Sequence, residues 1–191
     1  IRDNYATIVN TFVRGGIDFY GKELTIRNSY VEGGYGWWGY VVSRAGSVID
    51  IADSTIATKS GVTPDRNNGD GISPLGGARV IARRVLISGT ADGMKMSSNS
   101  VIEDSVIVDL AAVGSIHNDG IQIMGGSNIT IRNNRIAINQ PQNFNPAHHN
   151  AALFLQPLGG SSISNVQIEN NFLMGGGFAL RFEGNTTNIR V

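Results

Sequence analysis

The sequence predicts an all-β solenoid, in which short strands stack coil upon coil along the whole chain of 191 residues. The first observation behind this prediction is the alternation of apolar and polar residues at 121–123 and 129–131, which is typical of strands with one buried face. The second is repetition, because similar runs return at steps of roughly 22 to 32 residues, within the range of solenoid repeats. The third is composition, since only 16% of the residues are charged and 25 are glycine, as in turn-rich all-β chains.

Three strands are expected in each coil. The first is expected where an apolar run returns in the same phase, at residues 17–19, 40–42, 72–74, 94–96, 121–123, 153–155 and 180–182. A second follows in most coils, at residues 24–28, 49–53, 102–104, 129–133 and 166–170. A third, which ends at Ile136 and Ile138 in the coil of residues 116–138, closes the unit. These runs predict about seven coils around a column of buried residues: Ile26, Ile51, Ile72, Met94, Ile102, Ile121, Ile131, Leu153, Ile168 and Leu180.

A small polar residue that tolerates left-handed backbone ends the second strand of most coils. These residues are Asn28, Asp53, Asp104, Asn133 and Asn170, whereas the coil through residues 82–84 keeps the phase but lacks the side-chain amide. Because the coils stack, we expect these side chains to bond the backbone of neighbouring coils. The result would be a ladder with a structural role.

The segment I-T-I-R-N-N-R-I at residues 129–136 resembles the coil repeat of right-handed parallel β-helices, the pectin-lyase-like superfamily, and the resemblance covers nearly the whole chain. It implies one single-stranded, right-handed parallel β-helix domain over residues 1–191. The handedness agrees with the nearly universal right-handed crossover between parallel strands. The superfamily includes lyases, hydrolases, epimerases, adhesins and phage tail spikes, so the resemblance specifies the fold more closely than the function.

Composition excludes several classes of protein. The 15 basic and 15 acidic side chains balance, which gives no support for nucleic acid or an anionic membrane surface as partner. No apolar run approaches the roughly 18 residues that a membrane span needs. The absence of cysteine leaves the compartment open. Since both ends resemble interrupted coils without caps, we expect the chain to be a fragment of a longer protein.

The long connections are expected at one corner, after the third strand of a coil and before the first strand of the next. Insertions confined to one corner build a wall on one side of a solenoid, and that side is often the binding face. We expect this wall to hold Trp37, Trp38, His117, His148 and His149. Aromatic rings beside hydrogen-bonding groups suit the apolar faces of sugar rings. Alternatively, the tryptophans cover the apolar end of a coil, because exposed aromatic residues also mark protein interfaces.

Three Asp-Gly pairs, at Asp70, Asp92 and Asp119, precede the first strands of three successive coils. Neighbouring coils are about 4.8 Å apart, so these carboxylates should form a short column. Carboxylates this close together have three possible outcomes: the pKa of at least one aspartate is raised, a cation such as Ca²⁺ is bound, or the column pairs with Lys95. A general acid and a general base can be drawn from such a group. The alternative is a set of turns, in which each aspartate bonds backbone amides and each glycine takes positive φ.

The element His117-Asn118-Asp119-Gly120 is similar to the N-T-D-G element of polygalacturonase-like glycoside hydrolases, and the similarity implies an acid/base role for Asp119. The paired aspartates, the Gly-His-Gly and the Arg-Ile-Lys of that family are missing. The catalytic candidates are therefore Asp70, Asp92, Lys95, His117 and Asp119. The candidates for substrate binding are Trp37, Trp38, Gln122, His148, His149 and Arg181, with Lys95 and Arg181 expected to hold the carboxylate of an acidic sugar. His148 and His149 lack a partner with metal-ligand spacing, and no metal-binding set is expected from them.

Two classes of function remain open. The first is an extracellular β-helix that binds a polysaccharide in the side groove, with cleavage as a polysaccharide lyase or glycoside hydrolase still undecided. The second is a non-catalytic segment of a phage tail spike or surface fibre, on a virion or cell surface, which would form a homotrimer. The acid column and the aromatic loops favour polysaccharide recognition, which is the function that we expect.

Overall fold

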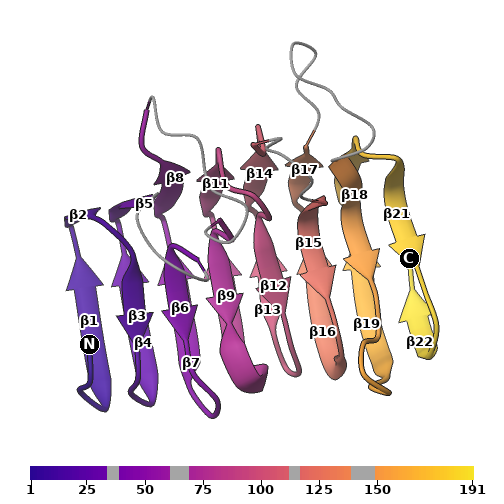
Figure 1. Cartoon of the computed structure of the whole chain (residues 1–191), viewed down its shortest axis with the longest axis horizontal. Helices are drawn as coiled ribbons and strands as arrows, with labels where there is room; N and C mark the ends of the chain where they lie inside the picture. Colours follow the sequence, from indigo (N-terminus) through magenta and orange to yellow (C-terminus); the bar gives the residue numbers. More distant parts are fainter. Residues whose placement is uncertain (34–38, 61–68, 112–116, 139–148) are drawn as a thin grey trace.

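The structure, a computed structural model, describes residues 1–33, 39–60, 69–111, 117–138 and 149–191. Three parallel sheets run along the molecule, with eight strands in sheet A and seven in each of sheets B and C. In Figure 1 the coils stand side by side along the longest axis, with the first and last coils at opposite ends. Each coil passes through sheets A, B and C in turn. This arrangement confirms the predicted parallel solenoid of about seven coils, with three strands in each coil.

All three sheets extend along the axis of the solenoid, and each strand pairs in parallel with its equivalent in the next coil. Sheet A consists of β1 (Tyr5–Val9), β4 (Glu23–Arg27), β7 (Val48–Ala52), β10 (Arg79–Arg83), β13 (Val101–Glu103), β16 (Gly126–Arg132), β19 (Ile163–Glu169) and β22 (Thr186–Arg190). Sheet B consists of β2 (Phe12–Arg14), β5 (Tyr30–Gly33), β8 (Thr55–Thr58), β11 (Leu86–Ser88), β14 (Val106–Val108), β17 (Arg135–Ala137) and β20 (Phe172–Met174). Sheet C consists of β3 (Ile17–Phe19), β6 (Val41–Ser43), β9 (Ile72–Pro74), β12 (Met94–Met96), β15 (Asn118–Ile123), β18 (His149–Leu155) and β21 (Phe178–Phe182).

The connections between sheets differ in length according to the corner. The three longest, which follow β8, β14 and β17, all run from sheet B to sheet C, as the sequence predicts. A single turn of 3₁₀ helix, Leu75–Gly77, follows β9. Among the described residues, no helix has the length and apolar character of a membrane span.

The core is a column of aliphatic side chains inside the coils. In sheet C, for example, Ile121 pairs with Met94 on one side and with Leu153 on the other, and all three side chains are completely buried. Of the ten residues predicted for the core, all are buried except Leu180, which is partly buried in the last strand of sheet C and packs against the core. The alternation of the strands therefore predicts correctly which side chains face inward.

The predicted strand at residues 40–42 is wrong by one residue. Val41, not Tyr40, pairs with Ile17, so the strand begins one position later. Tyr40 is buried, and its hydroxyl oxygen lies 2.6 Å from Oγ1 of Thr58. Its ring occupies the space above Gly33, where an added Cβ would lie 2.0 Å from the ring. Because the hydroxyl contact is made to β8 of the next coil, the local pattern does not reveal it.

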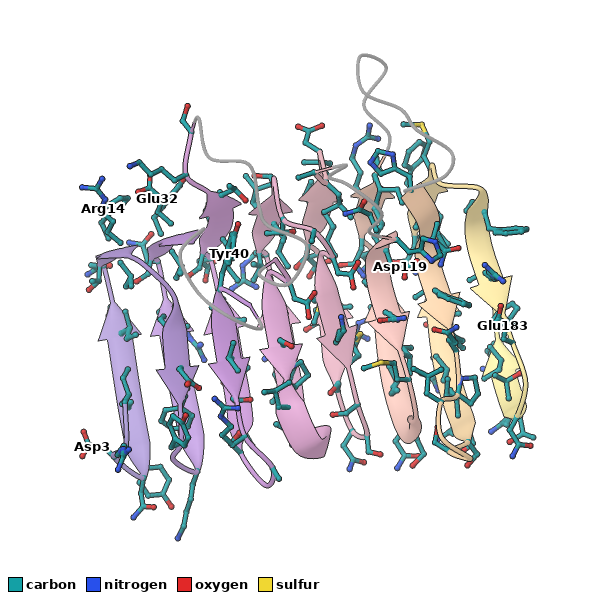
Figure 2. The ribbon with its side chains drawn as sticks, in the orientation of Figure 1. Asp3, Arg14, Glu32, Tyr40, Asp119 and Glu183 are labelled. Carbon is teal, nitrogen blue, oxygen red and sulfur yellow. The ribbon has the colours of Figure 1, made fainter. Side chains whose placement is uncertain are left out.

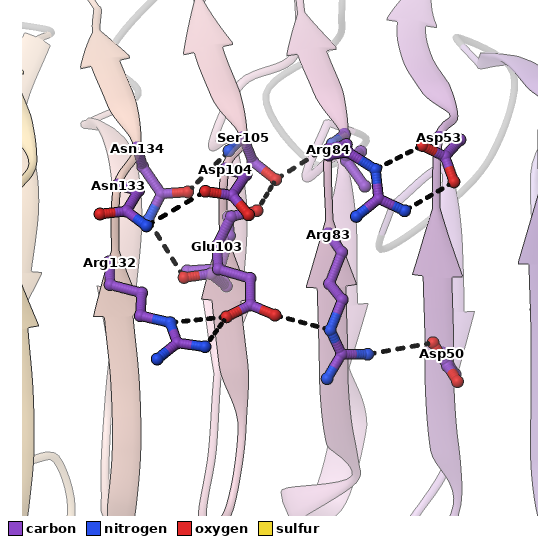
Figure 3. A network of polar contacts seen from close by, with 12 residues as sticks. Asp50, Asp53, Arg83, Arg84, Glu103, Asp104, Ser105, Arg132, Asn133 and Asn134 are labelled. Atoms are coloured by element: carbon purple, nitrogen blue, oxygen red, sulfur yellow. Dashed lines mark hydrogen bonds and ion pairs between the residues drawn. The ribbon is translucent and has the colours of Figure 1, made fainter.

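The corner ladder exists, but its contacts differ from those expected. The five predicted corner residues all have positive φ, between 45° and 55°. Side chains at this corner bond their equivalents in the neighbouring coil: Asn133 Nδ2 donates to Asp104 Oδ1 at 3.2 Å (Figure 3), and Asn28 Nδ2 donates to Asn10 Oδ1 at 2.7 Å. The following residue bonds the backbone instead: Asn134 Oδ1 accepts the N–H of Ser105 at 2.9 Å. The side chain that bonds the backbone of the neighbouring coil is therefore one position later than predicted.

The outer face of sheet A carries a ladder of ion pairs. Glu103 accepts hydrogen bonds from Arg83 at 2.7 Å and from Arg132 at 2.6 Å, so it joins three successive coils (Figure 3). The pKa of Glu103 is lowered, mainly by the hydrogen bond from Arg83. Asp50 pairs with Arg27 at 2.8 Å on the same face. This face is occupied by internal salt bridges and lies on a different side of the coil from the predicted acid column.

Candidate functional site

The candidate site is the outer face of sheet C, from β9 to β21. The strand register places Lys95 opposite Gln122, Gln122 opposite Phe154, and Phe154 opposite Arg181. Ser73 holds the matching position in β9, one residue after Ile72, which pairs with Met94. Five successive coils therefore contribute one outward side chain each to a single row.

Lys95 forms the centre of the acid column. Its Nζ lies 2.9 Å from Oδ2 of Asp70 and 2.9 Å from Oδ2 of Asp92. Asp70 also accepts a hydrogen bond from Oγ of Ser73 at 3.1 Å. Burial raises the pKa of Asp70 to about 6, with a further contribution from the charge of Asp92. Burial opposes the charge of Lys95, but the two aspartates outweigh it and raise the pKa of the ammonium.

The column continues through the backbone of the next coils. Asp92 Oδ1 accepts the backbone N–H of Asp119 at 2.8 Å. Asp119 Oδ1 accepts the N–H of Ala151 and the side-chain amide of Asn150, both at 3.0 Å. The two carboxyl groups thus link three coils, and part of each is occupied by these bonds. These bonds to backbone amides run from one coil to the next, not within the Asp-Gly turn that the turn alternative describes.

Asp119 is almost completely enclosed. Its residue is 2% exposed, and it lies where β15 meets β18 (Figure 2). Burial raises the pKa of Asp119 to about 8, and the charge of Asp92 adds to the effect. At neutral pH this carboxyl group is therefore mostly protonated, and it can donate a proton or a hydrogen bond.

The glycine of each Asp-Gly pair is required by close approach. A Cβ at Gly93 or at Gly120 would lie 2.3 Å from the carbonyl oxygen of the next coil, and a Cβ at Gly71 would lie 2.5 Å from one. None of these glycines has the positive φ that the turn alternative predicts. Any larger residue here would push the coils apart, so the motif sets the spacing of the column.

The far end of the row contains side chains that the sequence interpretation missed. Arg181 donates to Asn150 Oδ1 at 2.8 Å and forms an ion pair with Glu183, which Figure 2 labels in the last coil. The guanidinium carbon lies 4.8 Å from the ring centroid of Phe154 and 5.0 Å from that of Phe178. Glu183 lies two residues after Arg181, so strand alternation could have identified it. Asn150 is the extra residue of β18 at the register shift between β15 and β18, which the pattern does not reveal.

Two glutamines connect the middle of the row to its end. Gln122 Nε2 donates to Gln156 Oε1 at 3.1 Å, and Gln156 Nε2 donates to Glu183 Oε2 at 3.3 Å. Together with the contacts of Arg181, they extend the polar surface over three coils. Gln122 is a predicted binding residue, whereas Gln156 was missed although it lies two residues after Phe154.

The histidines and tryptophans are only partly placed on this face. His117 is exposed and lies immediately before β15. His149 is fully buried, and its Nε2 lies 3.4 Å from the carbonyl oxygen of Leu110, so the expectation that it lines an exposed wall is wrong. Trp37, Trp38 and His148 lie outside the described residues.

A calcium ion, one of three outcomes left open for the acid column, does not fit it, whereas the pairing with Lys95 is confirmed. The ammonium group of Lys95 lies between Asp70 and Asp92, at the place where a cation was expected. In the part of the chain that the structure describes, no group of three or more His, Cys, Asp or Glu side chains is arranged to hold a metal ion.

Two of the hollows on the outer surface of the described residues bear on the site. One of about 230 Å³ lies beside Lys95 and is lined by Ser73, Leu75, Ser97 and Met124 among others. The other, of about 410 Å³, lies on the first coils between sheets A and B, beside the stacked rings of Phe12 and Tyr30, whose centroids are 5.5 Å apart. The first hollow belongs to the row described above, whereas the larger one is separate from the acid column.

The two raised pKa values predict how stability depends on pH. Both Asp70 and Asp119 have folded pKa values above the ordinary 3.8, so the folded state binds more protons than the unfolded state between about pH 4 and 8. Stability contributed by these groups is present at low pH and is lost as the pH rises through about 6 and 8. We expect Asp119→Asn to remove much of this decline, a change on the order of a few kcal/mol at pH 8.

Urea denaturation of the parent and the variant from pH 5 to pH 8.5 measures this effect. Asp53→Asn is the matched control, because Asp53 is exposed and the hydrogen bond from Arg84 lowers its pKa. A decline with pH that is equally steep in the parent and in Asp119→Asn would contradict the assignment of Asp119 as a buried, protonated carboxyl group.

The comparisons with known proteins agree with the architecture. A family model described as a right-handed beta helix region matches residues 1–191, which also confirms the predicted handedness. No curated protein and no solved structure matched the chain. The match covers every coil of the three parallel sheets, and the chain therefore belongs to the right-handed β-helix family.

Proposed function

We propose that the chain binds a polysaccharide along the outer face of sheet C. The observation that carries the proposal is the unbroken series of hydrogen-bonding side chains from Asp70 to Glu183, which crosses five successive coils. A linear ligand with many hydroxyl groups meets such a series at regular intervals. An extracellular or surface location, where polysaccharides are found, is part of this proposal.

Apolar surface beside the polar row supports the same ligand class. The hollow beside Lys95 includes Leu75 and Met124, and Phe178 at the far end is 50% exposed. Sugar rings present both hydroxyl groups and apolar C–H faces, so they suit surfaces in which the two kinds of contact alternate.

Cleavage is the second candidate, as a polysaccharide lyase or glycoside hydrolase reaction. The pKa of Asp119, raised to about 8 by burial, favours it, because a protonated carboxyl group beside a second carboxyl group, that of Asp92, resembles an acid/base pair. Burial weighs against it, since Asp119 is 2% exposed and Oδ1 is bonded to the backbone. We therefore rank binding above cleavage.

The alternative class is a non-catalytic segment of a spike or surface fibre that forms a homotrimer. The regular ladders that bond coil to coil favour a structural role of this kind. Light scattering separates the two, because a tight trimer supports the fibre and a monomer supports the enzyme.

A glycan array with a pair of matched variants tests the proposed binding. Gln122→Ala removes a side chain from the row and should weaken binding about tenfold or more, whereas Gln167→Ala removes an exposed glutamine from sheet A and should leave binding unchanged. Binding of no glycan, or equal losses in both variants, would contradict the proposal. Analysis of products from any ligand, with Asp119→Asn as the inactive form, decides whether cleavage accompanies binding.

A further inference from the structure

We infer that the outer face of sheet C selects neutral, hydroxyl-rich glycans over acidic ones, an inference that rests on the proposed polysaccharide binding. It departs from the expectation that Lys95 and Arg181 capture the carboxylate of an acidic sugar. The reason is that each of these cations already has a carboxylate partner within the protein.

Lys95 is neutralised from both sides. Its ammonium lies 2.9 Å from Asp70 and 2.9 Å from Asp92, and its side chain is only 22% exposed. The carboxylate of an incoming sugar would compete with the carboxylates of Asp70 and Asp92, which the fold holds in place. The side chains of these two residues are only 16% and 10% exposed. An ammonium has three N–H donors, so a third is left for a neutral hydroxyl group after the two ion pairs are formed.

Arg181 is held in the same way at the other end of the row. It forms an ion pair with Glu183 and donates to Asn150 Oδ1, and its guanidinium lies near the rings of Phe154 and Phe178. These contacts engage several of its donors and much of its planar surface. An acidic sugar would therefore have to compete with the carboxylate of Glu183 for the guanidinium.

The charge balance of the row is negative. Between β9 and β21 the described residues place two cations, Lys95 and Arg181, on this face, against the carboxyl groups of Asp70, Asp92, Asp119 and Glu183. Even with Asp119 protonated, one carboxylate remains in excess when Asp70 is ionised. A uronate or sulfate group is therefore repelled. Repulsion between like charges at a binding face lowers the affinity for acidic ligands relative to neutral ones.

The surface beside Lys95 suits a neutral ring. The hollow of about 230 Å³ brings together the residues Ser73 and Ser97 with the apolar residues Leu75 and Met124. Both serine hydroxyl groups donate their hydrogen within the protein, Ser73 to Asp70 and Ser97 to the carbonyl oxygen of Ala78. Their oxygens can therefore accept from the hydroxyl groups of a neutral sugar, whereas a carboxylate has no hydrogen to donate to them. Among the described residues that line this hollow, Lys95 is the only cation.

Binding measurements on matched ligand pairs test the inference. Each pair consists of an oligouronate and the carboxyl-reduced oligosaccharide made from it, which share linkage and length and differ in charge. We expect the protein to bind the reduced member at least tenfold more tightly. Asp70→Asn combined with Asp92→Asn frees the charge of Lys95, and it should reduce this preference at least tenfold or reverse it. Asp50→Asn removes a paired carboxylate from sheet A and should leave the preference unchanged.

The outcomes separate this inference from the proposed function. Tighter binding of the uronate member by the unaltered protein overturns the selectivity and leaves polysaccharide binding intact, whereas binding of neither member of any pair overturns both. If the double variant fails to fold, Glu183→Gln frees Arg181 instead and should shift the preference in the same direction. An unchanged preference in a folded variant of either kind contradicts the inference.

Discussion

Replacement of Ile121 by aspartate is expected to unfold the chain. Ile121 is completely buried between Met94 and Leu153, in the column of aliphatic side chains that joins the coils of sheet C. An aspartate there would place a carboxylate in apolar surroundings without a partner, at a cost of several kcal/mol. Because each coil is stabilised by its neighbours, the damage should spread along the solenoid. Circular dichroism should show loss of the β signal, or the protein should aggregate.

Two milder substitutions serve as controls. Ile121→Val keeps the site apolar and should cost about 0.5–1.5 kcal/mol. Asn133→Ala should cost about 1–2 kcal/mol, because alanine is strained at a φ of 55°. A folded Ile121→Asp variant that is more stable than Asn133→Ala would overturn the assignment of core and corner.

Replacement of Lys95 by methionine is expected to destabilise the protein by about 3–5 kcal/mol at pH 8, because it leaves two largely buried carboxylates without their shared cation. The loss should be smaller at pH 5. The pKa of Asp70 is about 6 with Lys95 present and rises further without it, so at pH 5 this carboxyl group is protonated and needs no counter-charge. Lys22→Met, which removes an exposed lysine, is the control. Urea denaturation at both pH values measures the difference, and an equal loss at pH 5 and pH 8 would contradict the role of Lys95 as counter-ion.

Local alternation and the repeat were sufficient to predict the solenoid. The apolar residues of each short run face inward because successive side chains in a strand point to opposite faces, and this rule holds for Ile72, Met94, Ile121 and Leu153 alike. The corner residues were predicted for an equally local reason, since Asn and Asp tolerate positive φ.

What the sequence did not reveal depends on contacts between coils. The strand begins at Val41, and Tyr40 before it packs over Gly33 of its own coil and contacts Thr58 of the next coil. The burial of Asp119 follows from its bonds to Asn150 and Ala151, across the register shift between β15 and β18. Spacing alone indicates that charged residues share a phase, but not which of their atoms are already bonded.

The binding role of the outer face of sheet C is tested most directly by the location of a bound glycan. Titration of isotopically labelled protein with a neutral oligosaccharide that binds on the array, followed by NMR, reports this location directly. We predict that the largest shifts occur in β9, β12, β15, β18 and β21, including the side-chain amides of Gln122 and Gln156. Shifts confined to sheet A, or to the hollow beside Phe12 and Tyr30, would contradict the proposed site.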